Sequence, residues 1–148
     1  MEKILAIASD HAGYALKKSI EKHLDEIGVK YIDFGTDSTE SCNYPDFAHK
    51  LCVSMQSGEC YRGILVCGTG VGMSMTANKH KGIRAACCSD TFSAKATRMH
   101  NDANVLCMGE RVVGPGLAND LVDIFLSTEF EGGRHEKRVA MVNSYDER

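Results

Sequence analysis

The fold is decided by the stretch GILVCGTGVG at residues 63–72. Residues 63–67 form an all-apolar run with the length and character of a central strand in a parallel sheet. Three glycines at alternate positions then interrupt the run, and a helical pattern continues to about Asn78. A buried strand that passes through glycines into a helix predicts an α/β fold. It also predicts a ligand-binding turn at the carboxyl end of this strand.

The same alternation extends from this stretch in both directions. Further strand-like runs lie at residues 4–8, 30–34, 83–88 and 104–108, and helical patterns lie at about 12–27, 46–55, 90–102 and 115–126. Residues 36–45 are polar and are expected to form a loop. Five strands alternating with helices predict a five-stranded parallel sheet with helices on both faces. We expect one domain over residues 1–148, with residues 134–148 as a C-terminal helix.

The composition argues against several classes of function. The formal net charge is −3, whereas non-specific binding of nucleic acid needs a basic surface. No apolar run approaches the ~20 residues of a membrane-spanning helix, and the N-terminus runs straight into a strand without a leader pattern. The seven cysteines are odd in number and include no Cys-x-x-Cys pair, as is typical of free thiols in a reducing compartment. We therefore expect a cytoplasmic protein that binds neither nucleic acid nor membranes.

The glycines after residue 67 predict an anion site. Their backbone N–H groups can converge on one ligand, although a plain tight turn would also use one or two glycines. The stretch lacks the Gly-Lys-Ser/Thr of a nucleotide-binding P-loop, and it fits the dinucleotide fingerprint poorly. Cys67 sits beside a helix N-terminus, which favours its thiolate as a nucleophile or a base. A phosphatase would need arginine where Met73 stands, so that interpretation fails. The alternative is one more buried cysteine.

Other charged residues have two interpretations each. Asp10 and His11 follow the first strand, where they could contact a hydroxyl and a phosphate or simply cap a helix. Arg134 and Arg138 are four residues apart, so they could bind a phosphate together, but an isolated pair on a helix more often faces solvent. His100 could exchange a proton near neutral pH or be structural. No histidine spacing suggests a metal site.

These pieces together resemble one family, the type B ribose-5-phosphate isomerases. The resemblance covers nearly the whole chain. The related galactose-6-phosphate isomerase subunits share the CGTG stretch but lack the EGGRH segment and the His100 motif. The motifs that carry the resemblance are residues 9–13 (SDHAG), 44–46 (YPD), 67–74 (CGTGVGMS), 77–79 (ANK), 82–85 (GIRA), 100–104 (HNDAN), 109–111 (GER) and 131–135 (EGGRH).

The resemblance implies an aldose-ketose isomerase with a Rossmann-like three-layer sandwich and no cofactor or metal. It implies a homodimer that can pair further into tetramers. Some members of the family have a glutamate at the position of Met73 instead. Because this chain has methionine there, Cys67 would be the base that moves the proton. A neighbouring subunit would supply His100, Asn101 and Arg111 to a shared active site.

The resemblance also assigns roles to individual residues. Cys67, His100 and Thr69 would be catalytic, with His100 assisting the opening of the sugar ring. The 68–72 loop would stabilise the enediolate, and Asp10 and Tyr44 would lie near the sugar. The substrate-binding set is Asp10, His11, Tyr44, Gly68, Gly70, Val71, Gly72, Asn101, Arg111, Arg134 and Arg138, in which His11 and the three arginines would hold the phosphate.

The chemistry of this reaction agrees with the residues. Converting ribose 5-phosphate into ribulose 5-phosphate needs one base, stabilisation of an oxyanion and a phosphate anchor, and no redox cofactor. Two alternatives stay open. The substrate could be a six-carbon phosphate such as allose 6-phosphate or galactose 6-phosphate, or the protein could be a non-catalytic sensor of sugar phosphates.

Overall fold

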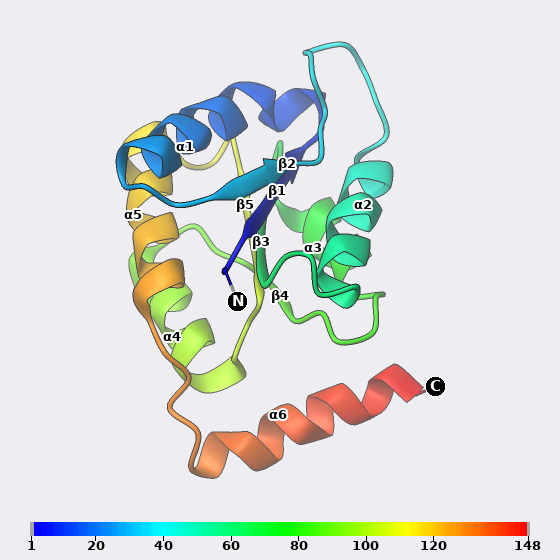
Figure 1. Ribbon diagram of the computed structural model, residues 1–148, viewed down its shortest axis with the longest axis vertical. Helices are drawn as coiled ribbons and strands as arrows, with labels where there is room; N and C mark the ends of the chain where they lie inside the picture. Colours follow the sequence, from blue (N-terminus) through cyan, green and yellow to red (C-terminus); the bar gives the residue numbers. More distant parts are fainter. Residues whose placement is uncertain (1, 148) are drawn as a thin grey trace.

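Five strands form one parallel sheet in the order β2-β1-β3-β5-β4 in the computed structural model, which describes residues 2–147 (Figure 1). The central strand β3 pairs with β1 on one side and β5 on the other, so the stretch quoted first lies in the middle of the sheet. The predicted α/β fold is confirmed. The strands are β1 (Leu5–Ser9), β2 (Tyr31–Asp33), β3 (Arg62–Cys67), β4 (Ala85–Cys87) and β5 (Val105–Gly109).

Six α-helices connect and follow these strands in the described part of the chain. The longest have 13 residues, and no helix within residues 2–147 is long and apolar enough to cross a membrane. The helices are α1 (Tyr14–Glu26), α2 (Tyr44–Gln56), α3 (Val71–Ala77), α4 (Thr91–Asn101), α5 (Pro115–Ser127) and α6 (Arg134–Ser144), with 3₁₀ turns at His11–Gly13 and Tyr145–Glu147.

Several predicted boundaries differ from the structure by a few residues, and two of the differences have clear physical reasons. The helix expected from Asp46 begins at Tyr44, because Pro45 in the first helical turn loses no intrahelical hydrogen bond. The first helical segment begins as a 3₁₀ turn, and the carboxylate of Asp10 accepts a hydrogen bond from the N–H of Gly13. Both differences move residues of interest onto the ends of helices.

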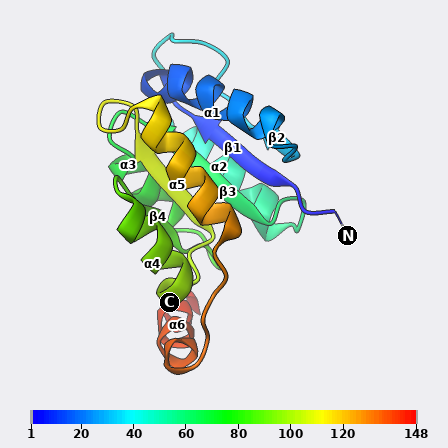
Figure 2. The ribbon, with the colours of Figure 1, turned by 90° about the vertical axis from the view of Figure 1, so that its left-hand side faces the viewer.

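The helices form two layers around the sheet. Helices α1, α4 and α5 cover one face, as Figure 2 shows, and α2 and α3 cover the other. Side chains alternate between the faces along each strand. Leu5, Ile64 and Leu106 pack against the first layer, and Leu65 and Cys67 pack against the second. The sulfur of Cys67 therefore faces α2 and α3.

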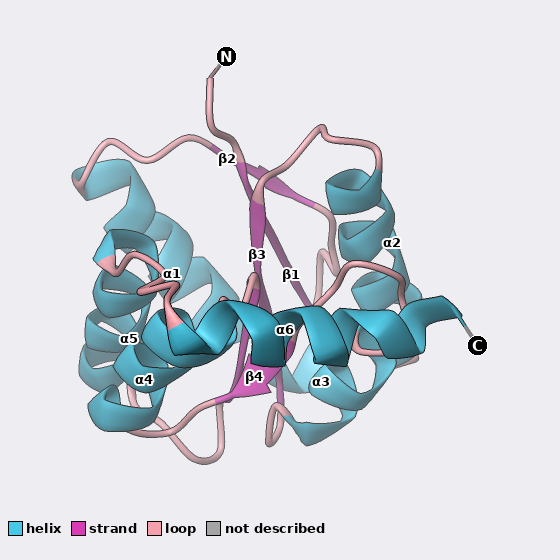
Figure 3. Cartoon of the chain, turned by 90° about the horizontal axis from the view of Figure 1, so that it is seen from below, coloured by secondary structure: helices cyan, strands magenta, loops and turns pink. Residues whose placement is uncertain are grey.

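Helix α6 stands apart from both layers. It crosses beneath the amino ends of the strands and contacts the body mainly through α4 (Figure 3). Two polar contacts hold its far end: Arg84 donates to Asn143 Oδ1 at 3.2 Å, and the Gly82 N–H donates to Asp146 Oδ2 at 2.9 Å. Three apolar side chains are exposed along the groove between this segment and the body: Met141 and Val142 on the helix, and Tyr145 in the 3₁₀ turn that follows it. An amphipathic helix with a bare apolar face predicts a further packing partner.

Candidate active site

Three predicted segments meet at the carboxyl edge of the sheet. Ser9 is in register with Val66, and Cys67 is in register with Gly109. The residues that follow β1, β3 and β5 must therefore emerge side by side. This edge brings together Asp10, His11, the 67–72 loop and Arg111, as the sequence predicted from strand ends alone.

Cys67 lies at the centre of this edge. Its side chain is buried, and the Gly70 N–H donates a hydrogen bond to Sγ at 3.0 Å. Gly70 has a φ of 84°, and a Cβ atom at this position would lie 2.8 Å from the carbonyl carbon of Met108. Only glycine fits there. The backbone N–H aimed at sulfur fixes the Cys67 side chain in one position at the carboxyl edge.

Strand β5 fixes the glycine loop from its other side. The N–H groups of Glu110 and Arg111 donate to the carbonyl oxygens of Cys67 and Gly68 at 2.9 and 3.1 Å. A Cβ on Gly109 would lie 2.5 Å from Thr69, so the two backbones are in direct contact. The loop conformation is therefore set by its own glycines together with hydrogen bonds from the residues that follow β5.

The structure places Arg111 beside the loop of its own chain. A Cβ on Gly68 would lie 3.7 Å from Arg111 Cδ. This differs from the expectation that the neighbouring subunit supplies Arg111, because β5 and β3 are adjacent strands whose ends emerge together. Arg111 is therefore a cation of the carboxyl edge.

Asp10 and His11 are held in defined orientations. Asp10 is buried and uses Oδ1 to accept from the Gly13 N–H at 3.0 Å, so the capping role considered from the sequence is present. His11 Nδ1 accepts from the Cys42 N–H at 3.2 Å. A neutral His11 ring must then carry its hydrogen on Nε2, which makes this nitrogen a donor suited to an anionic oxygen.

Tyr44 and Thr69 complete the carboxyl edge. The Tyr44 ring lies against Gly72, where a Cβ would meet Cε1 at 2.6 Å. Thr69 Oγ1 accepts from the Val71 N–H at 3.2 Å. The N–H groups of Gly70 and Val71 thus donate to acceptors within the loop itself. The sequence had predicted that the N–H groups of the whole loop face an anion.

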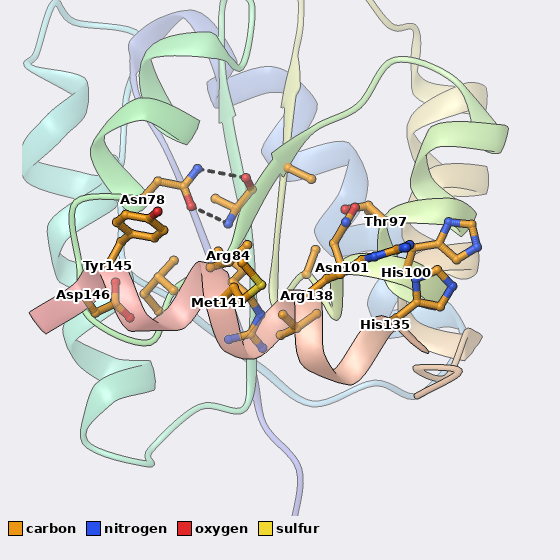
Figure 4. A pocket seen from close by; sticks show the side chains of 16 residues that line it. Asn78, Arg84, Thr97, His100, Asn101, His135, Arg138, Met141, Tyr145 and Asp146 are labelled. Carbon is orange, nitrogen blue, oxygen red and sulfur yellow. Dashed lines mark hydrogen bonds between the residues drawn. The ribbon is translucent and has the colours of Figure 1, made fainter. Parts of the chain in front are cut away.

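A second cluster of predicted residues lies at the amino edge of the sheet. His100 and Asn101 end α4, and Arg138 extends from α6. The three line a groove of about 880 Å³ between α6 and the body (Figure 4). Arg134 is exposed on the first turn of α6. The groove is therefore lined by the predicted ring-opening histidine and by one of the residues predicted to bind phosphate, Arg138.

The two clusters lie at opposite ends of β5. His100 and Asn101 precede Val105, the first residue of the strand, whereas Cys67 is level with Gly109, the last. Four residue steps of strand separate them by about 13 Å along the sheet. A single chain therefore does not bring His100, Asn101, Arg134 or Arg138 to the sulfur of Cys67.

Some contacts at these edges were missed by the sequence reasoning. At the amino edge, Glu131 Oε2 lies 3.3 Å from His100 Nε2, and the buried His135 ring stacks on His100 with centroids 4.3 Å apart. Both residues belong to the EGGRH motif, in which only Arg134 had been assigned a role. At the carboxyl edge, Cys87 Sγ donates to the carbonyl oxygen of Thr69 at 3.5 Å.

A buried ionic cluster supports the chain that leads to Tyr44. Lys17 is fully buried, and its Nζ lies 2.7 Å from Asp33 Oδ1 and donates to the carbonyl oxygen of Thr36 at 2.6 Å. Burial and the neighbouring Asp33 raise the pKa of Glu21 to about 7. Burial raises the pKa of Asp33, but the hydrogen bonds that its carboxylate accepts from Glu21 and Lys17 outweigh this effect and lower the pKa to about 2. The cluster anchors the start of the loop between β2 and α2.

Comparison with known proteins agrees with this arrangement of residues. The family model described as Ribose/Galactose Isomerase matches residues 5–142. The ribose-5-phosphate isomerase B of Escherichia coli strain K12 is 48% identical over 146 residues, which cover 99% of this chain and 98% of that protein.

Two solved structures have the same fold over almost their whole length. The ribose-5-phosphate isomerase B of Clostridium thermocellum has a TM-score of 0.95 and 51% identity, covering 97% of each chain. The ribose 5-phosphate isomerase of Thermotoga maritima has a TM-score of 0.94 and 46% identity, covering 97% of this chain and 99% of the other.

Proposed function

This chain belongs to the ribose/galactose isomerase family, and on that premise we propose that it interconverts ribose 5-phosphate and ribulose 5-phosphate with Cys67 as the base. The observation that carries the proposal is the hydrogen bond from the Gly70 N–H to Cys67 Sγ at the centre of the sheet edge. It supports a thiolate that is fixed in place and ready to accept a proton.

The isomerisation needs few groups. The Cys67 thiolate removes the C2 proton of the open-chain aldose, and negative charge develops on the oxygens of the enediolate. The N–H groups of Gly68, Thr69 and Gly72 stabilise this charge, and the Thr69 hydroxyl carries a proton between the two oxygens. Cys67 then returns its proton to C1, which gives the ketose and restores the thiolate. No electron leaves the substrate, so the step needs no redox cofactor.

The phosphate anchor and the ring-opening groups come from both clusters. His11 and Arg111 at the carboxyl edge, with Arg134 and Arg138 of the partner, bind the phosphate and hold the carbon chain within reach of sulfur. His100 of the partner protonates the ring oxygen as its bond to C1 breaks. Asp10 takes the proton of the C1 hydroxyl, and Tyr44 and the partner's Asn101 contact the sugar.

A homodimer with shared active sites accounts for the separation of the clusters. In a two-fold dimer, the amino edge of one chain can face the carboxyl edge of the other, and the reverse contact then forms as well. Exposed apolar side chains at both places support this pairing: Val71 and Met75 on α3, and Met141 and Val142 on α6. Pairing of dimers into tetramers and a cytoplasmic location are part of the proposal, the latter supported by seven free cysteines.

Turnover of ribose 5-phosphate, followed by the formation of ribulose 5-phosphate, is the direct test. Allose 6-phosphate and galactose 6-phosphate in the same assay decide between five-carbon and six-carbon substrates. A sensor of sugar phosphates would bind ribose 5-phosphate without turnover, and that result would overturn the proposal.

Mixing two inactive variants tests the shared site. Dimers of Cys67→Ala lack the base at both sites, and dimers of His100→Asn lack the ring-opening group at both. Co-refolding equal amounts makes half of the dimers mixed, each with one intact site of two, so activity should recover to roughly a quarter of the parent. No recovery, with mixed dimers proven by mass spectrometry, would place both residues of a site in one chain.

A further inference from the structure

Two residues beside His100 have no role in the reaction described so far. Glu131 Oε2 lies 3.3 Å from His100 Nε2. The His135 ring stacks on the His100 ring with centroids 4.3 Å apart and planes 17° from parallel (Figure 4). Glu131 is fixed by its backbone, because its N–H donates to the carbonyl oxygen of Met99 at 3.1 Å. His100 therefore has one neighbour at its edge and another against its face.

These three residues also resemble a set of metal ligands, since their donor atoms lie within 4.8 Å of one another. The geometry does not favour a metal. The lone pairs of a ring nitrogen lie in the ring plane, and two nearly parallel stacked rings cannot direct them at one ion. Arg134 and Arg138 add positive charge nearby. The arrangement instead suits a role in which Glu131 and His135 hold the imidazole ring of His100.

We propose that Glu131 and His135 are positioning residues that fix the His100 ring for opening of the sugar. The inference rests on the proposed function of His100. The Glu131 carboxylate lies 3.3 Å from Nε2 and holds this edge of the ring, and this leaves Nδ1 as the nitrogen that exchanges a proton with the ring oxygen of the substrate. His135 prevents the ring from tilting out of that plane.

The proton transfer requires this constraint. His100 ends α4 and its side chain is partly exposed, so an unsupported ring would rotate freely about its side-chain bonds. Ring opening moves one proton from Nδ1 to the ring oxygen while the bond from C1 to that oxygen breaks, and the C1 hydroxyl gives up its proton to Asp10. Misplacement of an acid by about 1 Å can slow such a step by about a hundredfold.

The charge state of His135 fits the role of a passive support. Burial lowers its pKa, and the positive charges of His100 and Arg134 lower it further. A neutral ring can stack on His100 without repelling its protonated form. The His135 ring can therefore stay stacked on His100 whether His100 is neutral or protonated.

The test separates ring opening from proton abstraction in the full-length enzyme. Ribulose 5-phosphate is open-chain, because the oxygen that would close its ring carries the phosphate. Exchange of its C1 proton with deuterated water, followed by NMR, therefore reports the step at Cys67 alone. We expect Glu131→Ala to slow turnover of ribose 5-phosphate by about tenfold to a hundredfold and to leave this exchange unchanged.

Conservative variants should restore the function. Glu131→Gln keeps an acceptor for Nε2 and should retain most of the turnover. His135→Phe keeps a stacked ring and should also retain it, whereas His135→Ala should behave like Glu131→Ala. Glu129→Ala is the matched control, since it removes an exposed carboxylate from the same segment without touching His100.

Each contrary outcome has a distinct meaning. A parallel loss of turnover and of C1 exchange in Glu131→Ala would show a general structural effect and overturn the inference. Normal turnover in Glu131→Ala beside slow turnover in His100→Asn would overturn the positioning role alone. Normal turnover in His100→Asn would overturn the proposed role of His100, and the inference with it.

Discussion

The two edges of the sheet position their functional groups in different ways. At the carboxyl edge, the backbone does so: Gly70 and Gly109 allow close contacts that no other residue permits, and neighbouring strands hydrogen-bond the loop. At the amino edge, the groups lie on the ends of α4 and α6, and side chains such as Arg84 and His135 hold them. The carboxyl edge is therefore complete within one chain, whereas the amino edge presents its groups outward, where a second chain can use them.

Removal of Cys67 should have the largest effect, because it breaks the chemistry of the carboxyl edge. Cys67→Ala is expected to lower turnover by at least ~10²-fold, as for a deleted general base, and to leave binding of the phosphosugar largely intact. Steady-state kinetics and calorimetric binding measure the two effects. Cys60→Ala, before the amino end of β3 and away from the 67–72 loop, is the control and should retain turnover. Near-normal turnover in Cys67→Ala would end its assignment as the base.

A substitution at Gly70 tests whether the backbone builds the carboxyl edge. Gly70→Ala adds a Cβ 2.8 Å from the Met108 backbone in a left-handed conformation, so we expect a loss of about 2–4 kcal/mol in the free energy of unfolding. Urea unfolding measures it. Gly116→Ala is the matched control, because its Cβ would meet nothing within 4 Å, and it should be neutral or slightly stabilising. Equal stability of the two variants would show that the loop relaxes easily.

Loss of Arg138 should affect the amino edge in binding rather than in chemistry. Arg138→Ala removes a charge-assisted contact to phosphate, so KM for ribose 5-phosphate should rise by the equivalent of about 1.5–3 kcal/mol. Lys137→Ala removes the neighbouring exposed cation and should change KM little. If the two variants have the same KM, Arg138 belongs to an ordinary solvated helix face.

The smallest expected effect is on the free energy of unfolding and comes from the buried ionic cluster of Lys17, Glu21 and Asp33. The folded-state pKa of Glu21 is raised to about 7 from 4.5, so its contribution to stability is present below about pH 4.5 and is lost as the pH rises through about 7. Glu21→Gln mimics the protonated acid. It should match the parent at pH 5 and be more stable at pH 8 by about 1–3 kcal/mol.

Urea unfolding at the two pH values measures this difference, and Glu26→Gln, an exposed acid on the same helix, should show none. The opposite linkage applies to Asp33, whose lowered pKa of about 2 means that its contribution is lost only below about pH 4. A Glu21→Gln variant that is less stable than the parent at pH 8 would mean that the ion pair with Lys18 outweighs the burial of the carboxylate.

Much of the fold followed from patterns along the chain. The strand β3 and the glycines after it were predicted because apolar runs and helix breaks are local signals. A C-terminal helix was predicted over 134–148 for the same reason, and the α-helix α6 ends earlier, at Ser144, before a 3₁₀ turn. The predicted start of α2 was wrong by two residues. A proline can either end a loop or open a helix, and the residues around Pro45 do not decide between these two positions.

The sequence by itself determined which residues could take part: a cysteine beside three glycines, a histidine before the last strand and two arginines one helical turn apart. Only the tertiary structure decided that these residues form two groups at opposite ends of β5, that Arg111 stands beside the loop of its own chain, and that Glu131 and His135 surround His100. The reason is physical. Periodicity and turn residues report the local conformation of the backbone, whereas the edge of the sheet at which a side chain emerges depends on hydrogen bonds between strands far apart in the sequence.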